Sequence, residues 1–393
     1  MNSKKIKFYL ALFFFIISFS YKSYAIKVQC PVDIDEDGIS DDPNAVCIHI
    51  AAGDGFVNMA DGRLQYVFGF RLIPAKLPNK LVMDYAMLGA TFPAPTIKVK
   101  EGQDLYLTLS NVGMVMRPDL FDPHTVHWHG FPNAASIFDG VPDASIAVNM
   151  GASITYYYHA HEPGTYMYHC HVEATEHMEM GMLGNIWVTP KQDGTPIEYP
   201  KGSGKVYTKF AYNDGDGSTG YDVDYPVQFH SFDAEFHDAN LNVQPLPFET
   251  LRTEYAMFNG RGYPDTTKEE VLLNSFNGKG SQNVPTAISA HVGERILLRM
   301  SNLSVSDFFT VTALGIPMTI VGKDARLLRS TSGENLYIKT NSVTLGGGEA
   351  ADVILDTEGV PPGKYFLYTT NLQYLCNYHQ ERGGMMTEIN LLP

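Results

Sequence analysis

Cysteine and histidine, the side chains best suited to hold a transition metal, meet in one short stretch of this chain. It reads Tyr-His-Cys-His-Val-Glu-Ala-Thr-Glu-His-Met-Glu-Met-Gly-Met, with Cys170 between His169 and His171 and with His177 and Met182 further along. A thiolate, imidazoles and a weakly bound thioether are the ligands of a blue-copper electron-transfer site. We therefore expect a copper site organised around Cys170.

Three more histidines occur upstream, in Asp-Pro-His-Thr-Val-His-Trp-His-Gly, where they are His124, His127 and His129. Successive side chains of a strand point to opposite faces. His127 and His129 therefore share one face, whereas His124, an odd number of residues away, points to the other. By the same rule, Cys170 points away from the two histidines that flank it.

This alternation sorts the ligands into two sets. The first is a buried one-electron site whose potential a thioether tunes. Its members are His124, Cys170, His177 and Met182. The second is an imidazole cluster, suited by donor type to copper, zinc or iron. Its members are His127, His129, His169 and His171. The backbone at Cys170 joins the two sets, so that an electron on the thiolate has a short covalent path to the cluster.

Short strands separated by turn signals must position these residues. Tyr and Phe are abundant, Gly and Pro are spread along the chain, and no long helical period is present, which is typical of all-β sandwiches. Three stretches recur in the second half: residues 99–111 resemble 291–302, residues 122–132 resemble 307–317, and residues 163–171 resemble 362–370. The sequence therefore predicts two copies of one sandwich.

The second copy keeps the scaffold and loses the metal ligands. In register, the three upstream imidazoles become Phe309, Thr312 and Leu314, and His-Cys-His becomes Tyr-Thr-Thr. The predicted organisation is a signal peptide at 1–25, an N-terminal extension at 26–60, a copper-bearing domain at 61–190, a linker at 191–205 and a second domain without copper ligands at 206–393.

The first 25 residues have the features of a secretory signal peptide: lysines, an apolar run and a Ser-Tyr-Ala cleavage site. Their removal takes away four lysines and no acid, so the formal net charge of −15 becomes −19. So acidic a chain is a poor ligand for nucleic acids or anionic membranes. We expect a protein that is secreted across the inner membrane into the periplasm, with no membrane attachment after cleavage.

An oxidising compartment allows Cys30 and Cys47 to form a disulfide. The loop between them places acidic oxygen ligands at alternate positions before a glycine, a pattern typical of a calcium-type site. The candidate calcium ligands are Asp33, Asp35, Asp37 and Asp41. The alternative is a solvated acidic turn, because Asn44 stands where a bidentate Glu would complete a full site.

The two metal-binding stretches resemble those of the multicopper oxidases, the laccase-like cupredoxin family, in a two-domain form. Residues 124–130 resemble the family's His-x-x-His-x-His-Gly, and residues 169–182 resemble its His-Cys-His followed by His and Met. The resemblance implies two tandem cupredoxin-like Greek-key β-sandwiches. It also implies type 1 copper at His124, Cys170, His177 and Met182, type 2 copper at His127, and type 3 copper at His129, His169 and His171.

Such oxidases take electrons one at a time from a small-molecule or metal-ion reductant and reduce oxygen to water at a trinuclear centre. Asp139 and Glu173 are candidate proton donors near that centre, with ordinary solvated acids as the alternative. The family's centre uses eight histidines, four from each of two facing domains, whereas this chain supplies four. Two-domain relatives are commonly homotrimers, and outward-facing imidazoles fit such an interface.

Two other functions remain open from the sequence. One is a nitrite-reductase-like enzyme with type 1 copper and one mononuclear type 2 copper, although His127 stands where that family has a catalytic Asp. The other is a non-catalytic copper-binding or electron-transfer protein. His159 and His161 share a strand face and are candidate additions to the imidazole cluster.

Overall fold

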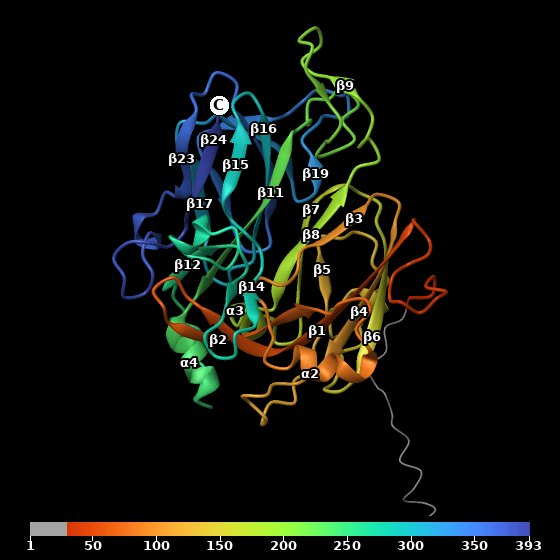
Figure 1. Cartoon of the computed structure of the whole chain (residues 1–393), viewed down its shortest axis with the longest axis vertical. Helices are drawn as coiled ribbons and strands as arrows, with labels where there is room; N and C mark the ends of the chain where they lie inside the picture. Colours follow the sequence, from red (N-terminus) through yellow and green to blue (C-terminus); the bar gives the residue numbers. More distant parts are fainter. Residues whose placement is uncertain (1–29) are drawn as a thin grey trace, which may run out of the picture.

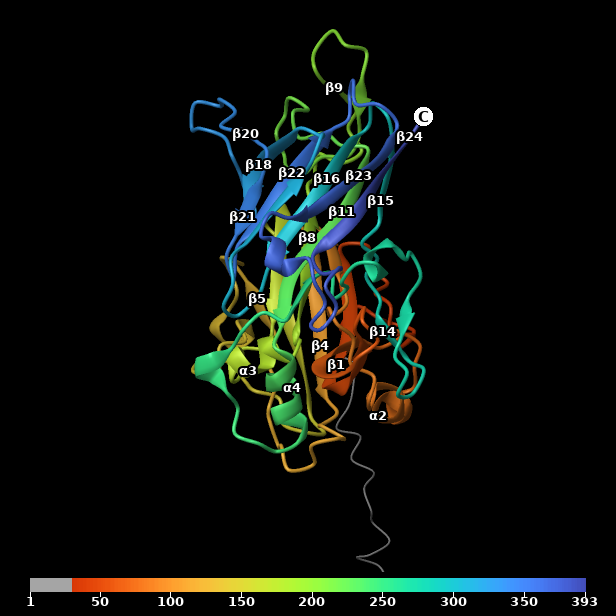
Figure 2. The same ribbon diagram turned by 90° about the vertical axis from the view of Figure 1, so that its left-hand side faces the viewer.

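The computed structural model describes residues 30–393, and the predicted signal peptide lies outside these residues. Strands make up most of the regular structure, and among the described residues no helix is both long and apolar enough to cross a membrane. Two β-sandwiches are stacked along the long axis, with the first half of the chain below and most of the second half above (Figure 2). The expectation of all-β sandwiches is confirmed.

The first sandwich consists of two four-stranded sheets. One has the order β2 (Leu64–Leu72), β1 (Ala45–Asn58), β4 (Asp104–Asn111) and β6 (Ser153–His159). The other has the order β3 (Ile97–Lys100), β8 (Leu183–Thr189), β7 (Gly164–His169) and β5 (His127–His129). Strand β1 lies in the predicted N-terminal extension, yet it pairs antiparallel with β2 and parallel with β4, so it is an integral part of this sandwich.

The second sandwich repeats this arrangement. Its larger sheet contains β12 (Tyr255–Phe258), β11 (Val223–Phe232), β16 (Arg295–Asn302), β22 (Ala350–Asp356), β18 (Met318–Lys323), β19 (Arg326–Leu327) and β20 (Ile338–Thr340). Its facing sheet has the order β15 (Ile288–His291), β24 (Met386–Leu392), β23 (Gly363–Thr369), β17 (Phe309–Ala313) and β21 (Val343–Leu345).

Short elements decorate the sandwiches (Figure 1). Within residues 30–393, the α-helices are α2 (Val82–Ala86), α3 (Ala174–Glu179) and α4 (Ala234–Leu241). Two small ribbons pair β9 (Ile197–Glu198) with β10 (Val206–Tyr207) and β13 (Leu272–Leu273) with β14 (Gly280–Gln282). Single 3-10 turns are η1 (Asn79–Leu81), η2 (Ser136–Phe138), η3 (Phe248–Thr250), η4 (Asp265–Thr267) and η5 (Leu372–Tyr374).

Two buried asparagines show the internal repeat at atomic detail. The Asn111 amide donates to the backbone carbonyls of Asp122 and Val148, at 2.8 and 2.9 Å. The Asn302 amide does the same at the matching carbonyls of Asp307 and Leu345, at 3.2 and 2.8 Å. Each amide ties together the loop and strand that flank the metal-ligand stretch or its counterpart, so the repeat predicted from sequence is confirmed.

The two sandwiches share a continuous interface. A buried apolar cluster contains Phe92, Met167 and Leu183 from the first sandwich together with Phe232 and Met257 from the second. Polar contacts reinforce it, since the Thr165 hydroxyl donates to Asp352 Oδ1 at 2.6 Å and Arg326 pairs with Glu162. The predicted Cys30–Cys47 disulfide is present and joins the start of the described chain to β1.

Candidate metal centre

The cysteine site lies inside the first sandwich, at the end of β7. Cys170 follows the last residue of that strand, His177 lies in α3, and His124 is held by a β-bridge to Val148. The Cys170 sulfur lies 3.2 Å from Nδ1 of His177 and 3.8 Å from Nδ1 of His124. All three side chains are fully buried. One thiolate and two imidazole nitrogens thus converge on a single point, and this donor set fits a copper ion.

The loop after β7 returns the chain to the cysteine. Glu173 has a positive φ of 43°, which turns the chain into α3. The Met182 N–H then donates to the His177 carbonyl at 2.8 Å, and the Cys170 N–H donates to the Met182 carbonyl at 3.1 Å. Met182 is buried in the same apolar cluster as Cys170. The structure therefore brings the side chains of His124, Cys170 and His177 together, and it pairs the backbone of Met182 with those of Cys170 and His177.

The charges of this site favour a metal-binding thiolate. Burial opposes ionisation of Cys170, but the rings of His177 and His124 outweigh it and hold the pKa of the thiol well below its usual range. Burial lowers the pKa of His177, but Cys170 and Asp122 outweigh it and raise that pKa to about 10. The Nε2 atoms of both histidines have no hydrogen-bond partner among the described residues. Thiolate and imidazole are therefore held together in a buried pocket, and these are the ligands that a soft metal prefers.

The imidazole cluster lies on the opposite face of the same strands. His127 on β5 is the antiparallel partner of His169 on β7. Nδ1 of His129 lies 3.4 Å from Nε2 of His169, and the His127 ring centroid is 5.2 Å from that of His171. Nitrogens of His127, His129 and His169 all lie within 4.8 Å of one another. The four histidines assigned to the second set therefore meet in one place.

Backbone carbonyls orient two of these rings. Nδ1 of His127 donates to the Asp139 carbonyl at 2.6 Å, and Nδ1 of His169 donates to the Cys170 carbonyl at 2.8 Å. Both rings are thereby left with Nε2 free to bind a metal. Burial lowers the pKa of His169 to about 3, so this ring is neutral, which is the ligand form, near neutral pH.

The two predicted proton donors lie in different places. Asp139 is beside the imidazole cluster, with Oδ1 3.6 Å from Nδ1 of His127. Glu173 instead groups with Asp122 and His177, at the cysteine site. The role of Glu173 as a proton donor near the imidazole cluster stays a prediction.

Two further groups predicted from sequence have a clear location. The rings of His159 and His161 meet edge to face, with centroids 4.6 Å apart, at and just after the end of β6 in the facing sheet. Nδ1 of His159 lies 2.6 Å from Asp104 Oδ1. In the acidic loop, oxygens of the three aspartates 33, 35 and 37 lie within 4.8 Å of one another. One of these carboxylates already forms an ion pair with Lys76 and another accepts backbone N–H groups. The calcium site stays a prediction.

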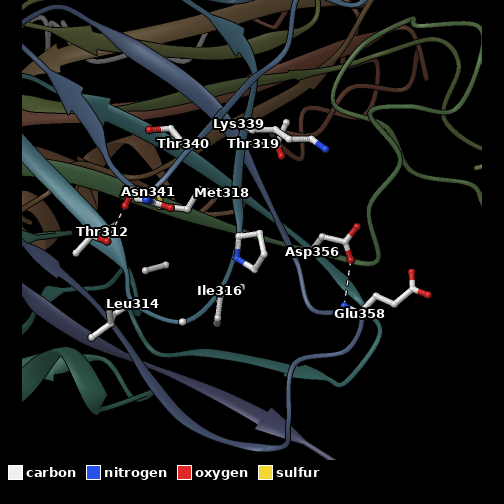
Figure 3. A pocket seen from close by; sticks show the side chains of 13 residues that line it. Thr312, Leu314, Ile316, Met318, Thr319, Lys339, Thr340, Asn341, Asp356 and Glu358 are labelled. Carbon is white, nitrogen blue, oxygen red and sulfur yellow. Dashed lines mark hydrogen bonds between the residues drawn. The ribbon is translucent and has the colours of Figure 1, made fainter.

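The second sandwich carries no imidazole at the matching positions. Thr312 on β17 is the antiparallel partner of Tyr368 on β23, as His127 is of His169 in the first sandwich. Figure 3 shows the groove beside them, of about 910 Å³, which contains Thr312 and Leu314 and no histidine. The Thr312 hydroxyl donates to the Asn341 carbonyl at 2.7 Å. The scaffold of a metal site is preserved without its ligands.

Two neighbours of the site were missed from the sequence. Oδ2 of Asp122 lies 3.7 Å from Nε2 of His177, and Gly348 of the second sandwich lies against the His129 ring. The sequence could have predicted that Asp122 lies near the site, because it stands two residues before His124 and so shares its face in an extended chain. It could not have predicted the position of Gly348, because this residue approaches from another domain.

Comparison with known proteins places both halves of the chain in the same family. Residues 76–193 and residues 244–387 each match a family model described as multicopper oxidase. Laccase-5 of Arabidopsis thaliana is 26% identical over 279 residues, which is 70% of this chain and 40% of that protein. Multicopper oxidase MmcO of Mycobacterium tuberculosis is 24% identical over 288 residues, 69% of this chain and 47% of that protein. The chain thus spans less than half the length of these relatives.

Solved structures agree with the fold. The blue copper oxidase from Nitrosomonas europaea superposes with a TM-score of 0.62 at 25% identity, covering 87% of this chain and 85% of that one. A copper nitrite reductase from Nitrosomonas europaea superposes with a TM-score of 0.58 at 16% identity, over 88% of this chain and 94% of that one, and shows the fold alone.

Proposed function

We propose a copper-dependent oxidoreductase function for this chain, which belongs to the multicopper oxidase family. Copper, when bound, would supply one-electron chemistry at the cysteine site and oxygen reduction at the imidazole cluster. The type 1 ligands in this proposal are His124, Cys170, His177 and Met182. The type 2 and type 3 ligands are His127, His129, His169 and His171.

The observation that carries the proposal is the position of Cys170 between the two sites. Its side chain lies with His177 and His124, while the rings of the neighbouring His169 and His171 belong to the imidazole cluster. An electron received at the Cys170 thiolate therefore reaches the imidazole cluster through the backbone to the adjacent residue, either His169 or His171. The side chains of the cysteine site and of the imidazole cluster are buried or half-buried, so the transferred electron is shielded from bulk water.

The entry side of the proposed path is acidic. His177 is fully buried, and its Nε2 points toward Asp122, which is itself only 18% exposed. The exposed Glu173 belongs to the same group of side chains. Two carboxylates at this place attract a cationic electron donor. They also suit a phenol, because a carboxylate can accept the proton that the phenol loses together with its electron. We therefore propose a small phenol or a reduced metal ion as the electron donor.

Asp139 is the proposed proton donor on the oxygen side. Its carboxylate is about one-third exposed and lies next to the His127 ring, so it connects the imidazole cluster with bulk water. Oxygen reduction consumes protons, and a carboxyl group at this boundary can deliver them.

We further propose a periplasmic homotrimer. The signal-type sequence at residues 1–25 supports export, and a disulfide near the start of the described chain fits an oxidising compartment. The trimer follows from the family resemblance, and light scattering coupled to size exclusion tests it directly.

Copper content per chain, combined with electron spin resonance of the same sample, tests the main proposal. We expect more than two copper ions per chain, with a type 1 signal and with some copper that is spin-silent. Two copper ions with type 1 and type 2 signals would favour the nitrite-reductase-like alternative. One copper ion with only a type 1 signal would exclude both enzyme functions and leave an electron-transfer protein.

Oxygen consumption then tests the reaction. With phenolic donors and with cuprous ion, the wild-type protein should consume oxygen, whereas His127→Gln, which removes one ring of the cluster and leaves the cysteine site intact, should not. Reduction of the cysteine site by the donor in that variant would show that only the second half of the path is broken.

A further inference from the structure

Two histidines at the end of β6 lie apart from both groups of the proposed metal centre. The side chains alternate along this segment, so that Tyr158 and Ala160 are buried, whereas His159 is half-buried and His161 is exposed. The two histidines therefore share the outer face of their sheet. Within that sheet β6 has a strand partner only on the side of β4, so it forms the edge. Both rings can be reached from solution.

The imidazole cluster lies on the other outer face of the same sandwich. Trp128, which stands between two cluster ligands on β5, points inward, and its ring centroid is 5.1 Å from that of Tyr158 on β6. These two rings fill the space between the sheets, which pack about 10 Å apart in such sandwiches. The outward neighbours of the two rings therefore point in opposite directions. His159 and His161 are too far from the cluster to add ligands to it within one chain.

The two outer rings are close enough to share one metal ion. Their centroids are 4.6 Å apart and their planes are inclined at 68°. In the imidazole cluster, the centroids of His127 and His171 are 5.2 Å apart. Zinc–nitrogen bonds of about 2.0–2.1 Å place two ligand nitrogens at most about 4 Å apart. This separation is within reach of the rings of His159 and His161, and imidazole is a donor that suits zinc and copper.

A carboxylate on the neighbouring strand orients one of the rings. Asp104 on β4 is the cross-strand partner of His159. Nδ1 of His159 donates to Oδ1 of Asp104 at 2.6 Å, and the Tyr157 hydroxyl donates to the same oxygen at 2.9 Å. The Nδ1 edge of His159 is thereby occupied, and Nε2 is left for a metal. Metal-binding histidines typically have such a carboxylate partner behind them.

Water would complete the coordination of an ion held by these rings. The His161 ring contacts that of His159, and it makes no hydrogen bond within residues 30–393. The next residue, Glu162, is paired with Arg326 of the second sandwich. Two protein ligands at an exposed edge allow exchange with solution, unlike a closed structural site with four protein ligands. The formal net charge of −15 favours the approach of cations.

We propose that His159 and His161 form a surface site for a divalent zinc or copper ion, with Asp104 as a positioning residue. The site shares no ligand with the cysteine site or the imidazole cluster, so the inference does not rest on the proposed function. It does bear on the copper count that tests that function, because copper(II) held by imidazole and water gives a type 2 signal. That count is therefore made in His161→Gln as well as in the wild type.

The first test is zinc binding to the metal-free protein, measured by equilibrium dialysis. The wild type should bind one more zinc ion per chain than either His159→Gln or His161→Gln. His291→Gln, which replaces an exposed histidine of the second sandwich, is the matched control and should bind as the wild type does. The comparison is independent of how much zinc the other sites take up. Equal binding by the wild type and both variants would overturn the inference, and so would a loss in only one of them, because a lone ring would then hold the ion.

The second test concerns Asp104. Asp104→Ala should weaken zinc binding at this site at least about tenfold, as the loss of such a partner does elsewhere. Asp104→Asn, which keeps an acceptor oxygen for the His159 ring, should recover most of the affinity. Tyr157→Phe removes the other donor to this carboxylate and should leave the affinity unchanged. Wild-type affinity in Asp104→Ala would overturn the positioning role.

Copper(II) adds a spectroscopic test. Loaded with excess copper(II), the wild type should show a type 2 signal in electron spin resonance that His161→Gln lacks. Such a signal belongs to the surface site, whatever the imidazole cluster binds. Type 2 signals of equal intensity in the two proteins would overturn the inference and assign that copper to the cluster.

Discussion

His230 offers a quantitative test of how the domain interface responds to pH. It lies on β11, is 1% exposed, and its ring centroid is 5.3 Å from those of Phe92 and Phe232. Neither ring nitrogen makes a hydrogen bond of normal geometry, although the ring approaches the backbone of neighbouring residues. Burial, and to a lesser extent the nearby His237, lowers the pKa of His230 from 6.5 to about 3. The folded protein therefore holds this imidazole in its neutral form.

The sign of the pH effect follows from the two pKa values. The unfolded chain binds a proton at His230 below pH 6.5, and the folded chain does not until about pH 3, so the folded state loses stability as the pH falls through this window. At pH 5 the loss from this one residue is about 2 kcal/mol. In His230→Phe the loss disappears, and a phenyl ring suits the same aromatic surroundings.

Guanidinium unfolding of the metal-free chain, followed by tryptophan fluorescence at pH 7.5 and pH 5.0, measures the effect. Between pH 7.5 and pH 5.0, the unfolding free energy of the wild type should fall by about 2 kcal/mol more than that of His230→Phe. The same replacement at the exposed His291 is the control for exchanging histidine for phenylalanine outside the domain interface. A difference for His230→Phe that does not change with pH would refute the reasoning, because it would mean that the buried ring accepts a proton in the folded protein.

Three other substitutions test the sites and the interface. Cys170→Ser should abolish the blue charge-transfer absorbance of the copper-loaded protein while circular dichroism stays unchanged, and persistence of the colour would disprove the type 1 assignment. Asp122→Asn removes the carboxylate that lies 3.7 Å from Nε2 of His177; steady-state kinetics should show KM for a cationic donor rising about tenfold, with little change for an uncharged phenol. Thr165→Val removes the donor to buried Asp352 and should lower the unfolding free energy by about 1–3 kcal/mol in denaturant titrations, whereas an unchanged value would show that water replaces the hydroxyl.

Much of the proposed metal centre could be predicted because it depends on local geometry. The alternation of side chains along a strand separates Cys170 from His169 within three consecutive residues, and no knowledge of the fold is needed to see it. The same rule puts His127 and His129 together. The repeat, and the absence of ligands from its second copy, are also properties of the sequence alone.

Contacts between distant segments were decided only by the tertiary structure. From the sequence, Glu173 was a candidate proton donor near the imidazole cluster. In the structure a positive φ turns the chain at this residue, and its carboxylate groups with Asp122 and His177. Strand β1 was assigned from the sequence to an N-terminal extension. Its pairing with β4, which lies more than 40 residues further along the chain, became visible only in the structure. Gly348 reaches His129 across a domain interface, and that approach is set by packing and hydrogen bonds in both sandwiches, for which the residues themselves carry no local pattern.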